Sequence, residues 1–116
     1  MEIKAKFKVA YLDEADEFLD SLPTKVRDKI LYNINKSKYV IDPEIFKKLG
    51  DTNIWEFRTR YNGLAYRMLA FWDSRSDTLV VATHGFSKKT QKTPSKEIAK
   101  AEAIRAKYFE LKSSAE

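Results

Sequence analysis

The sequence contains no cysteine, a single histidine, three glycines and three prolines in 116 residues. The absence of cysteine excludes disulfide scaffolds, thiolate metal sites and cysteine nucleophiles. No run of about 18 apolar residues occurs, which excludes a membrane-spanning helix. Lysines alternate with apolar residues near the N-terminus, and no apolar signal-peptide core follows them. We therefore expect one cytoplasmic domain over residues 1–116 that does not associate with membranes.

The sequence also lacks the residue patterns of common cofactor and metal sites. It has no glycine-rich phosphate loop and no helix with paired metal-binding histidines. Five acids near the N-terminus follow one another at helical spacing around an apolar stripe: Asp13, Glu14, Asp16, Glu17 and Asp20. This pattern is more typical of a solvated helix face than of a metal site. The expectation is that the protein uses neither a metal nor a cofactor.

Positive charge is distributed unevenly along the chain, which has a formal net charge of +5. Residues 1–53 hold ten Lys or Arg and ten Asp or Glu, whereas residues 54–116 hold twelve and seven. The whole excess therefore lies in the second half, which favours a polyanionic partner. A solubilising surface is the alternative, and the positions of the cations must decide between the two.

The first half of the chain predicts a strand followed by two helices. Lysines alternate with apolar residues over residues 3–9, which indicates a strand with one wet face at a sheet edge. Apolar side chains then recur at intervals of three and four over residues 11–21, as in a helix. A proline fits the first turn of a second helix over residues 23–39, which completes a helical hairpin. Residues 42–53 are expected to form a loop with one helical turn at residues 44–48.

The second half predicts a three-strand meander and a last helix. Alternating side chains indicate strands over residues 55–60, 64–72 and 78–86, with an Asn-Gly hairpin turn between the first two. Pro94 opens the last helix, which Thr93 is expected to cap. The order is β-α-α-β-β-β-α, an α+β fold in two layers with a mainly antiparallel sheet and a helical hairpin.

The first two meander strands carry arginines whose positions need an explanation. Arg58 and Arg60 share one face of their strand with Glu56, because successive side chains alternate. Arg67 lies in a strand that is apolar on both faces. Two interpretations stay open for Arg67. It forms an ion pair with Glu56, or it contacts phosphate on the exposed side of the sheet through its planar guanidinium fork.

The segment His-Gly-Phe-Ser-Lys-Lys-Thr-Gln-Lys-Thr-Pro, residues 84–94, is the main candidate for a working surface. It holds three lysines and no acid, together with hydroxyl and amide donors that commonly contact phosphate. It also leads to a helix N-terminus, which attracts anions. His84 is expected at a strand end beside a glycine, where it is either structural or moves a proton. Because there is one histidine, RNA cleavage needs Lys, Arg or Tyr as a second proton-transfer group, or catalytic power supplied from outside the protein.

Three stretches of the sequence resemble one protein family: residues 54–58 (Ile-Trp-Glu-Phe-Arg), residues 66–69 (Tyr-Arg-Met-Leu) and residues 84–94. They are similar to the HigB-type, phage-derived branch of the RelE/ParE toxin superfamily, and the element order from about Phe7 to Tyr108 is similar too. The resemblance implies the toxin of a type II toxin–antitoxin pair. Such toxins typically enter the ribosomal A site and cleave mRNA there, and a helix-turn-helix antitoxin, here HigA-like, neutralises them.

The resemblance and the charge pattern together give the expected site residues. In the superfamily, an arginine of the middle meander strand binds phosphate, and the basic stretch after the last strand contributes further residues. The expected catalytic residues are Arg67, His84, Lys88 and Arg58, and the expected RNA-binding residues are Arg60, Lys89, Gln91 and Lys92. Some RelE members carry a lysine pair on the first meander strand, where this sequence has Ile54 and Glu56.

Two other functions stay open. The first is a non-catalytic, ParE-like toxin that binds and poisons DNA gyrase, although such a binder has no evident need for strand-borne arginines beside a histidine. The second is a chain that serves as one half of a repressor complex and contacts little by itself.

Overall fold

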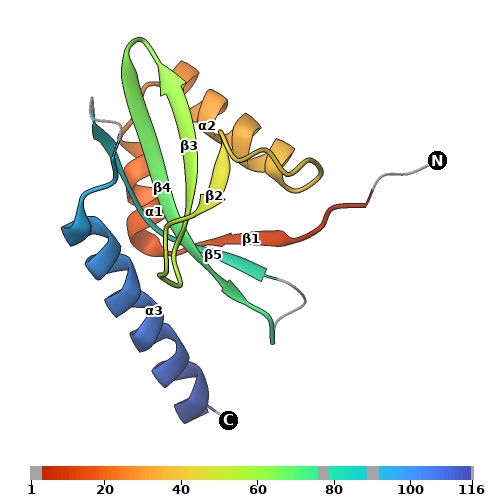
Figure 1. The fold of residues 1–116 in the computed structure, drawn as a ribbon, viewed down its shortest axis with the longest axis vertical. Helices are drawn as coiled ribbons and strands as arrows, with labels where there is room; N and C mark the ends of the chain where they lie inside the picture. The colour runs from red at the N-terminus through yellow and green to blue at the C-terminus, as the bar shows by residue number, and fades with distance from the viewer. Residues whose placement is uncertain (1–3, 76–78, 89–91, 116) are drawn as a thin grey trace.

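The computed structural model describes residues 4–75, 79–88 and 92–115. Figure 1 shows a central sheet with helices packed around it. The described elements, in chain order, are β1 (Lys8–Tyr11), α1 (Asp13–Asp20), α2 (Thr24–Ser37), β2 (Phe46–Lys48), β3 (Trp55–Tyr61), β4 (Leu64–Asp73), β5 (Leu79–Lys88) and α3 (Ser95–Ala115). No helix within these residues is both long and apolar enough to cross a membrane.

The sheet has the strand order β1-β5-β4-β3-β2. β1 pairs with β5 in parallel, and the other neighbouring strands are antiparallel. The expected α+β class, the mainly antiparallel sheet and the place of the first strand at an edge are therefore confirmed. The β3–β4 hairpin turns at Asn62 and Gly63, whose φ angles are 49° and 78°. Two successive positive φ angles are what an Asn-Gly hairpin turn requires, so the sequence placed this turn correctly.

Helices cover both faces of the sheet, because alternate side chains of the central strands enter two separate cores. Met68 and Ala70 of β4 face the α1–α2 hairpin and pack with residues such as Ile30 and Ile34. The intervening residues of β4 face α3; Leu69 and Phe71 pack in a cluster that includes Ala101, Ile98 and Tyr108. The expected helical hairpin is present. The third layer formed by α3 is an addition to the two layers that the sequence predicted.

The segment expected to be a loop with a helical turn contains a strand instead. Residues 46–48 form β2, which pairs with β3 so that Phe46 lies opposite Phe57. The Phe46 side chain is buried, and its ring stacks on Phe57 at a centroid distance of 4.2 Å. A three-residue strand has too few side chains to show an alternating pattern, so tertiary pairing decides its structure.

The expected element ends also shift at both ends of the sheet. β1 begins at Lys8 and runs to Tyr11, so α1 begins only at Asp13. β5 continues to Lys88 rather than ending at residue 86. As a consequence His84 lies in the interior of a strand, and its expected place at a strand end is wrong.

A β-bulge in β5 changes which face the last residues of this strand present. Leu69 of β4 pairs with His84, whereas the next residue, Ala70, pairs with Ala82, so Thr83 is an extra residue on β5. An extra residue reverses the alternation of faces beyond it. His84 therefore lies on the α3 face, and Gly85 lies against Phe18 of α1. The Thr83 hydroxyl donates a hydrogen bond to the Leu69 carbonyl (3.2 Å) and so holds the bulge.

Gly85 is required at its position by packing. A Cβ on this residue would overlap the Phe18 ring and lie only 2.7 Å from the ring's Cγ atom, which cannot swing away as a flexible chain end can. We expect Gly85→Ala to lower the free energy of unfolding by about 1–3 kcal/mol, as overpacking typically does. Urea unfolding of the variant measures this. In a Phe18→Ala background the same change should cost much less, and an equal cost in both backgrounds would contradict the explanation.

The far end of β4 is tied to the second half of α3 by a buried carboxylate. Asp73 is fully buried and accepts hydrogen bonds from the Tyr108 hydroxyl and the Lys112 ammonium, both at 2.7 Å. Burial by itself raises the pKa of Asp73, but the bonds from Lys112, Tyr108 and the Arg75 backbone outweigh it and lower the pKa to about 2. Charge-assisted bonds of this kind favour the ionised acid.

This depressed pKa predicts how stability depends on pH. Because the folded pKa lies below the ordinary value of 3.8, the contribution of Asp73 is present above about pH 4 to 5 and is lost as the pH falls toward 2. Asp73→Asn should remove about 2 kcal/mol of stability at pH 7 and flatten the pH dependence in that window. Urea unfolding between pH 2 and 7 tests this. The exposed Asp28→Asn variant should keep the wild-type slope.

Candidate active site

The strand arginines meet at the middle of the β3–β4 hairpin. Arg58 of β3 lies opposite Arg67 of β4 in the register, so both side chains project from the same face of the sheet. Glu56 projects from this face too, two residues before Arg58. The Arg67 side chain is only 1% exposed, so the expectation of a phosphate contact on an exposed surface is wrong. The alternative, an ion pair between Arg67 and Glu56, is confirmed at 3.5 Å.

Glu56 is the centre of a buried polar network. Its Oε1 atom lies 3.4 Å from Arg58 Nε and 3.5 Å from Arg67 Nε. Its Oε2 atom accepts a hydrogen bond of 2.6 Å from the Thr93 hydroxyl, which itself accepts one of 2.8 Å from Arg67 Nη1. The Thr93 side chain therefore links the acid to the buried arginine. Its expected role as the cap of the last helix is wrong.

The charges of Glu56, Arg58 and Arg67 explain why these three side chains lie together. Burial lowers the pKa of Arg67, and the neighbouring Glu56 carboxylate opposes this by favouring the charged guanidinium. A guanidinium stays protonated in proteins, so its charge needs a partner at this depth. One carboxylate between Arg58 and Arg67 also reduces the repulsion between two like charges that face each other across the strands.

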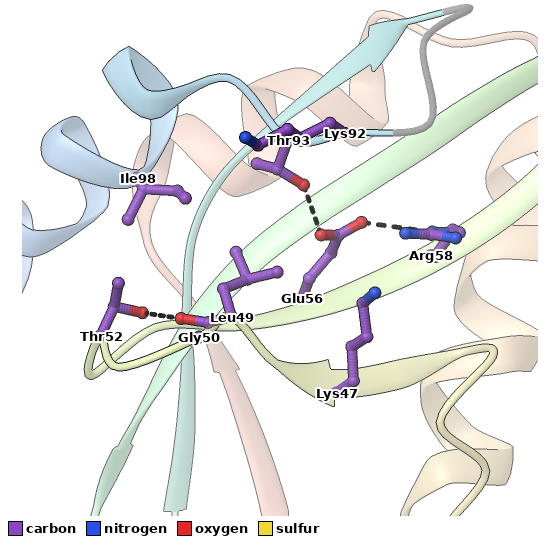
Figure 2. Close-up of a pocket in the computed structure, with 9 residues that line it drawn as sticks. All are labelled: Lys47, Leu49, Gly50, Thr52, Glu56, Arg58, Lys92, Thr93 and Ile98. Carbon is purple, nitrogen blue, oxygen red and sulfur yellow. Dashed lines mark hydrogen bonds and ion pairs between the residues drawn. The ribbon is translucent and has the colours of Figure 1, made fainter.

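A pocket of about 450 Å³ opens beside this network. Figure 2 shows Glu56 between Thr93 and Arg58, with Lys47 reaching toward it from β2 and Lys92 on the segment that precedes α3. Apart from these, the described lining residues are Leu49, Gly50, Thr52 and Ile98. Glu56 is the one acid in this described lining, and three cations from three separate parts of the chain surround it. The pocket is thus suited to an anion, while Glu56 holds the cationic side chain of Arg58 in place.

Arg60 lies on β3, two residues after Arg58 and outside the described lining of the pocket. It is exposed and lines a second groove with Arg58, which therefore belongs to both hollows. Of the basic segment, Lys88 is the last residue of β5 and Lys92 is exposed at the pocket. Lys89 and Gln91 lie outside the described residues. The structure thus brings Arg58, Arg67 and Lys92 around Glu56 and keeps Arg60 at the neighbouring groove.

His84 lies away from the described lining of this pocket and connects β5 to α3. It is 4% exposed, with Nδ1 at 3.0 Å from the Thr83 hydroxyl and Nε2 at 3.1 Å from Glu97 Oε1 in the first turn of α3. Burial lowers the pKa of His84, and the hydrogen bond with Glu97 opposes this. Both ring nitrogens are engaged inside the protein, which favours the structural interpretation of this residue.

For three residues of the site, the sequence predicted either no role or a different role. Lys47 lies in β2, which was expected to be a helical turn, so its register with β3 was not foreseen. Thr93 was expected to cap a helix, and Glu56 was considered only as a partner for Arg67. The alternation along β3 did place Glu56 on the face of Arg58, and this was the available signal for Glu56. Nothing local in the sequence connects residues 47 and 93 to that face.

The fold and the pocket define a class of protein: a small basic α+β domain whose antiparallel hairpin presents a cationic pocket around a buried acid. Residues 17–106 match the family described as phage-derived protein Gp49-like (DUF891). Since the match covers well over half of the sequence, the chain belongs to this family. None of the curated protein sequences matches the chain.

Three solved structures have the same fold. The toxin RelE of E. coli in the free state, a double arginine-to-alanine mutant, gives a TM-score of 0.62 at 16% identity, over 88% of this chain and 98% of that one. The RelBE2 toxin–antitoxin complex of Mycobacterium tuberculosis gives 0.57 at 19% identity, over 74% and 95%. The intact RelBE toxin–antitoxin complex of E. coli gives 0.54 at 14% identity, over 73% and 98%. The expected RelE-like fold is therefore confirmed.

The hydroxyl of Thr93 is expected to be necessary for the buried network. Thr93→Val keeps the shape of the side chain but leaves Glu56 Oε2 and Arg67 Nη1 without this partner, which should cost about 1–3 kcal/mol of stability. Thr93→Ser restores the hydroxyl and should recover most of the loss. Urea unfolding of the two variants measures the difference between them. Equal stability of the two variants would show that the hydroxyl does not hold the network.

Proposed function

We propose that this protein is the toxin of a type II toxin–antitoxin pair, of HigB type, and cleaves mRNA on the ribosome. The observation that carries the proposal is the convergence of Lys47, Arg58 and Lys92 on the buried carboxylate of Glu56 in one pocket. Three cations suit a phosphodiester, whose charge increases as the reaction proceeds. The RelE-like fold and the membership of a phage-derived family agree with this function.

In the proposed reaction, the ribose 2′-oxygen attacks the adjacent phosphorus while the bond from phosphorus to the 5′-oxygen breaks. The products are a 2′,3′-cyclic phosphate and a 5′-hydroxyl end. A neutral lysine amine of the pocket accepts the proton of the 2′-hydroxyl, and a lysine ammonium of the pocket donates a proton to the leaving 5′-oxygen, so Lys47 and Lys92 are the candidates for these two roles. The nucleophile belongs to the substrate and the cations belong to the protein, so this reaction requires no metal ion.

We assign different roles to the expected catalytic residues on the basis of their contacts. Arg58 is half-buried at the pocket wall, where its guanidinium is placed to stabilise the phosphoryl oxygens. Arg67 is a positioning residue, because its contacts are with Glu56 and Thr93 inside the protein. The buried ring of His84 contacts the start of α3, so we assign proton transfer to the pocket lysines instead. Arg60 would contact RNA beside the pocket, and Lys88, Lys89 and Gln91 of the basic segment are proposed as further phosphate contacts.

The proposed partners follow from the same function. The ribosome would present the mRNA, and a helix-turn-helix antitoxin of HigA type would neutralise the toxin by covering its basic surface. The similar folds include toxins in complex with antitoxins, which supports a partner of this kind. A gyrase-binding, non-catalytic function has no observation in its favour here, since a binder does not need a buried acid beneath a cationic pocket.

Expression of the protein in cells, followed by mapping of mRNA 5′ ends, tests the function. Wild-type protein should stop growth and create new 5′ ends within coding regions. Arg58→Gln should reduce cleavage on the order of 100-fold or more, since removal of a group that stabilises transition-state charge typically costs this much. Glu56→Gln removes the charge that pairs with Arg58 and Arg67, so it should also reduce cleavage, because Arg58 loses the partner that holds it at the pocket wall.

Lys107→Gln on the exposed side of α3 is the matched control, because it removes one positive charge away from the pocket and should cleave like the wild type. Urea unfolding and circular dichroism of each purified variant verify that it folds. Intact messages together with induction of the DNA-damage response would reject the nuclease and favour the gyrase-binding alternative. Unchanged cleavage by Arg58→Gln would reject this pocket as the catalytic site.

A further inference from the structure

A second hollow lies next to the pocket, between α2 and the part of β3 that extends past β2. Its volume is about 650 Å³, and its described lining consists of Lys29, Asn33, Lys36, Glu44, Ile45, Arg58 and Arg60. Four of these residues are cations and one is an acid. In Figure 1 the β3–β4 hairpin runs far beyond β2, so this stretch of β3 is flanked by α2 instead of another strand.

The cations of this groove form a line rather than a cluster. Lys29 and Lys36 are seven residues apart on α2, which is roughly 10.5 Å along a helix. Arg58 and Arg60 are two residues apart on β3, which is roughly 6.6 Å along a strand. Two such rows on opposite walls suit an extended polyanion better than a single phosphate group. Because Arg58 also lines the pocket, the groove continues directly from the candidate catalytic site.

An exposed aromatic ring lies beside the lysine row. Tyr32 is 62% exposed and lies three residues after Lys29 and four before Lys36, which places the three side chains on one side of α2. The Lys29 ammonium lies 5.6 Å from the centroid of the Tyr32 ring. Exposed aromatic rings next to a cationic groove are the usual platforms for the bases of single-stranded nucleic acid. An acidic peptide has no comparable use for such a ring.

The walls of the groove are held together by buried hydrogen bonds. The Asn33 amide of α2 donates to the Thr59 hydroxyl of β3 (3.0 Å), and the Arg58 backbone amide donates to the Ile45 carbonyl (2.8 Å). Thr59 is buried, so the contact is protected from water. The separation of α2 and β3 is therefore fixed before any ligand binds, which lowers the entropic cost of binding.

We propose that this groove binds the single-stranded RNA that continues from the scissile phosphate, with its backbone on the four cations and one base on Tyr32. The proposal rests on the proposed function, which supplies RNA as the substrate. It adds a binding track on α2 and assigns roles to Lys29, Tyr32 and Lys36, which the sequence did not indicate.

Binding of a fluorescein-labelled, unstructured RNA 12-mer with 2′-O-methyl riboses tests the groove without any cleavage. Fluorescence anisotropy at several salt concentrations should show that the double variant Lys29→Gln/Lys36→Gln binds on the order of 10-fold more weakly than the wild type at low salt. The slope of log affinity against log salt should fall by about 0.7 for each lost phosphate contact. Lys96→Gln/Lys107→Gln removes the same charge from exposed positions on α3 and should bind like the wild type.

The stacking role of Tyr32 is tested in the same assay. Tyr32→Leu should weaken binding roughly fivefold or more while the salt slope stays the same, because the lost contribution is base stacking and not charge. Tyr32→Phe keeps the ring and should bind like the wild type. The exposed positions of these side chains make loss of folding a small concern, and circular dichroism of each variant verifies it.

Three outcomes would overturn the proposal. The first is wild-type protein with no salt-dependent RNA binding, and the second is an equal loss of RNA binding in the α2 and α3 double variants. The third is unchanged RNA binding in both double variants, together with binding of a labelled poly-glutamate peptide that only the α2 variant loses. The last result would assign the groove to an acidic protein partner. If the groove variants bind RNA normally while Arg58→Gln still abolishes cleavage in cells, the groove is rejected and the nuclease function stands.

Discussion

A carboxylate with almost no exposed surface lies between two guanidinium groups, and the other features of the site depend on it. Burial of Glu56 as an ion is tolerable because Arg58, Arg67 and the Thr93 hydroxyl together satisfy both of its oxygens. Thr93 belongs to the segment before α3, so the same network fixes where that helix begins. Arg58 is held at the pocket wall by the same acid. The Glu56 carboxylate therefore holds both the arginine of the pocket wall and the segment that leads into α3.

The bulge at Thr83 has an equally wide effect in the same region of the α3 face, since Glu56 and His84 both pair with Leu69 of β4. One extra residue directs His84 toward Glu97 in the first turn of α3 and turns Gly85 toward Phe18 of α1. Both helical layers are thus positioned by consecutive residues of β5. At the far end of β4, Asp73 binds Tyr108 and Lys112 and anchors the second half of the same helix. Thr93, Glu97 and Asp73 are among the residues whose polar contacts hold α3 along its length.

Much of the fold follows from local patterns. The Asn-Gly turn, the amphipathic helices and the alternation along β3 and β4 were predicted because each depends on neighbours within a few residues. The short β2 was not predicted, since its pairing with β3 decides its conformation. For the candidate site, alternation placed Glu56 and Arg58 on one face. It gave no information on the depth of Arg67, which contacts Thr93 of the segment that precedes α3.

The sequence by itself determined the α+β order, the absence of thiol chemistry, the excess of positive charge in the second half and the shared face of Glu56 and Arg58. These properties depend on composition and on short-range periodicity. Tertiary structure alone decided that Arg67 is buried, that Thr93 completes its network, that Lys47 and Lys92 reach one pocket, and that His84 faces α3. Each of these depends on residues brought together from distant parts of the chain, or on a single bulged residue that reverses the periodicity. No local pattern in the sequence records either of them.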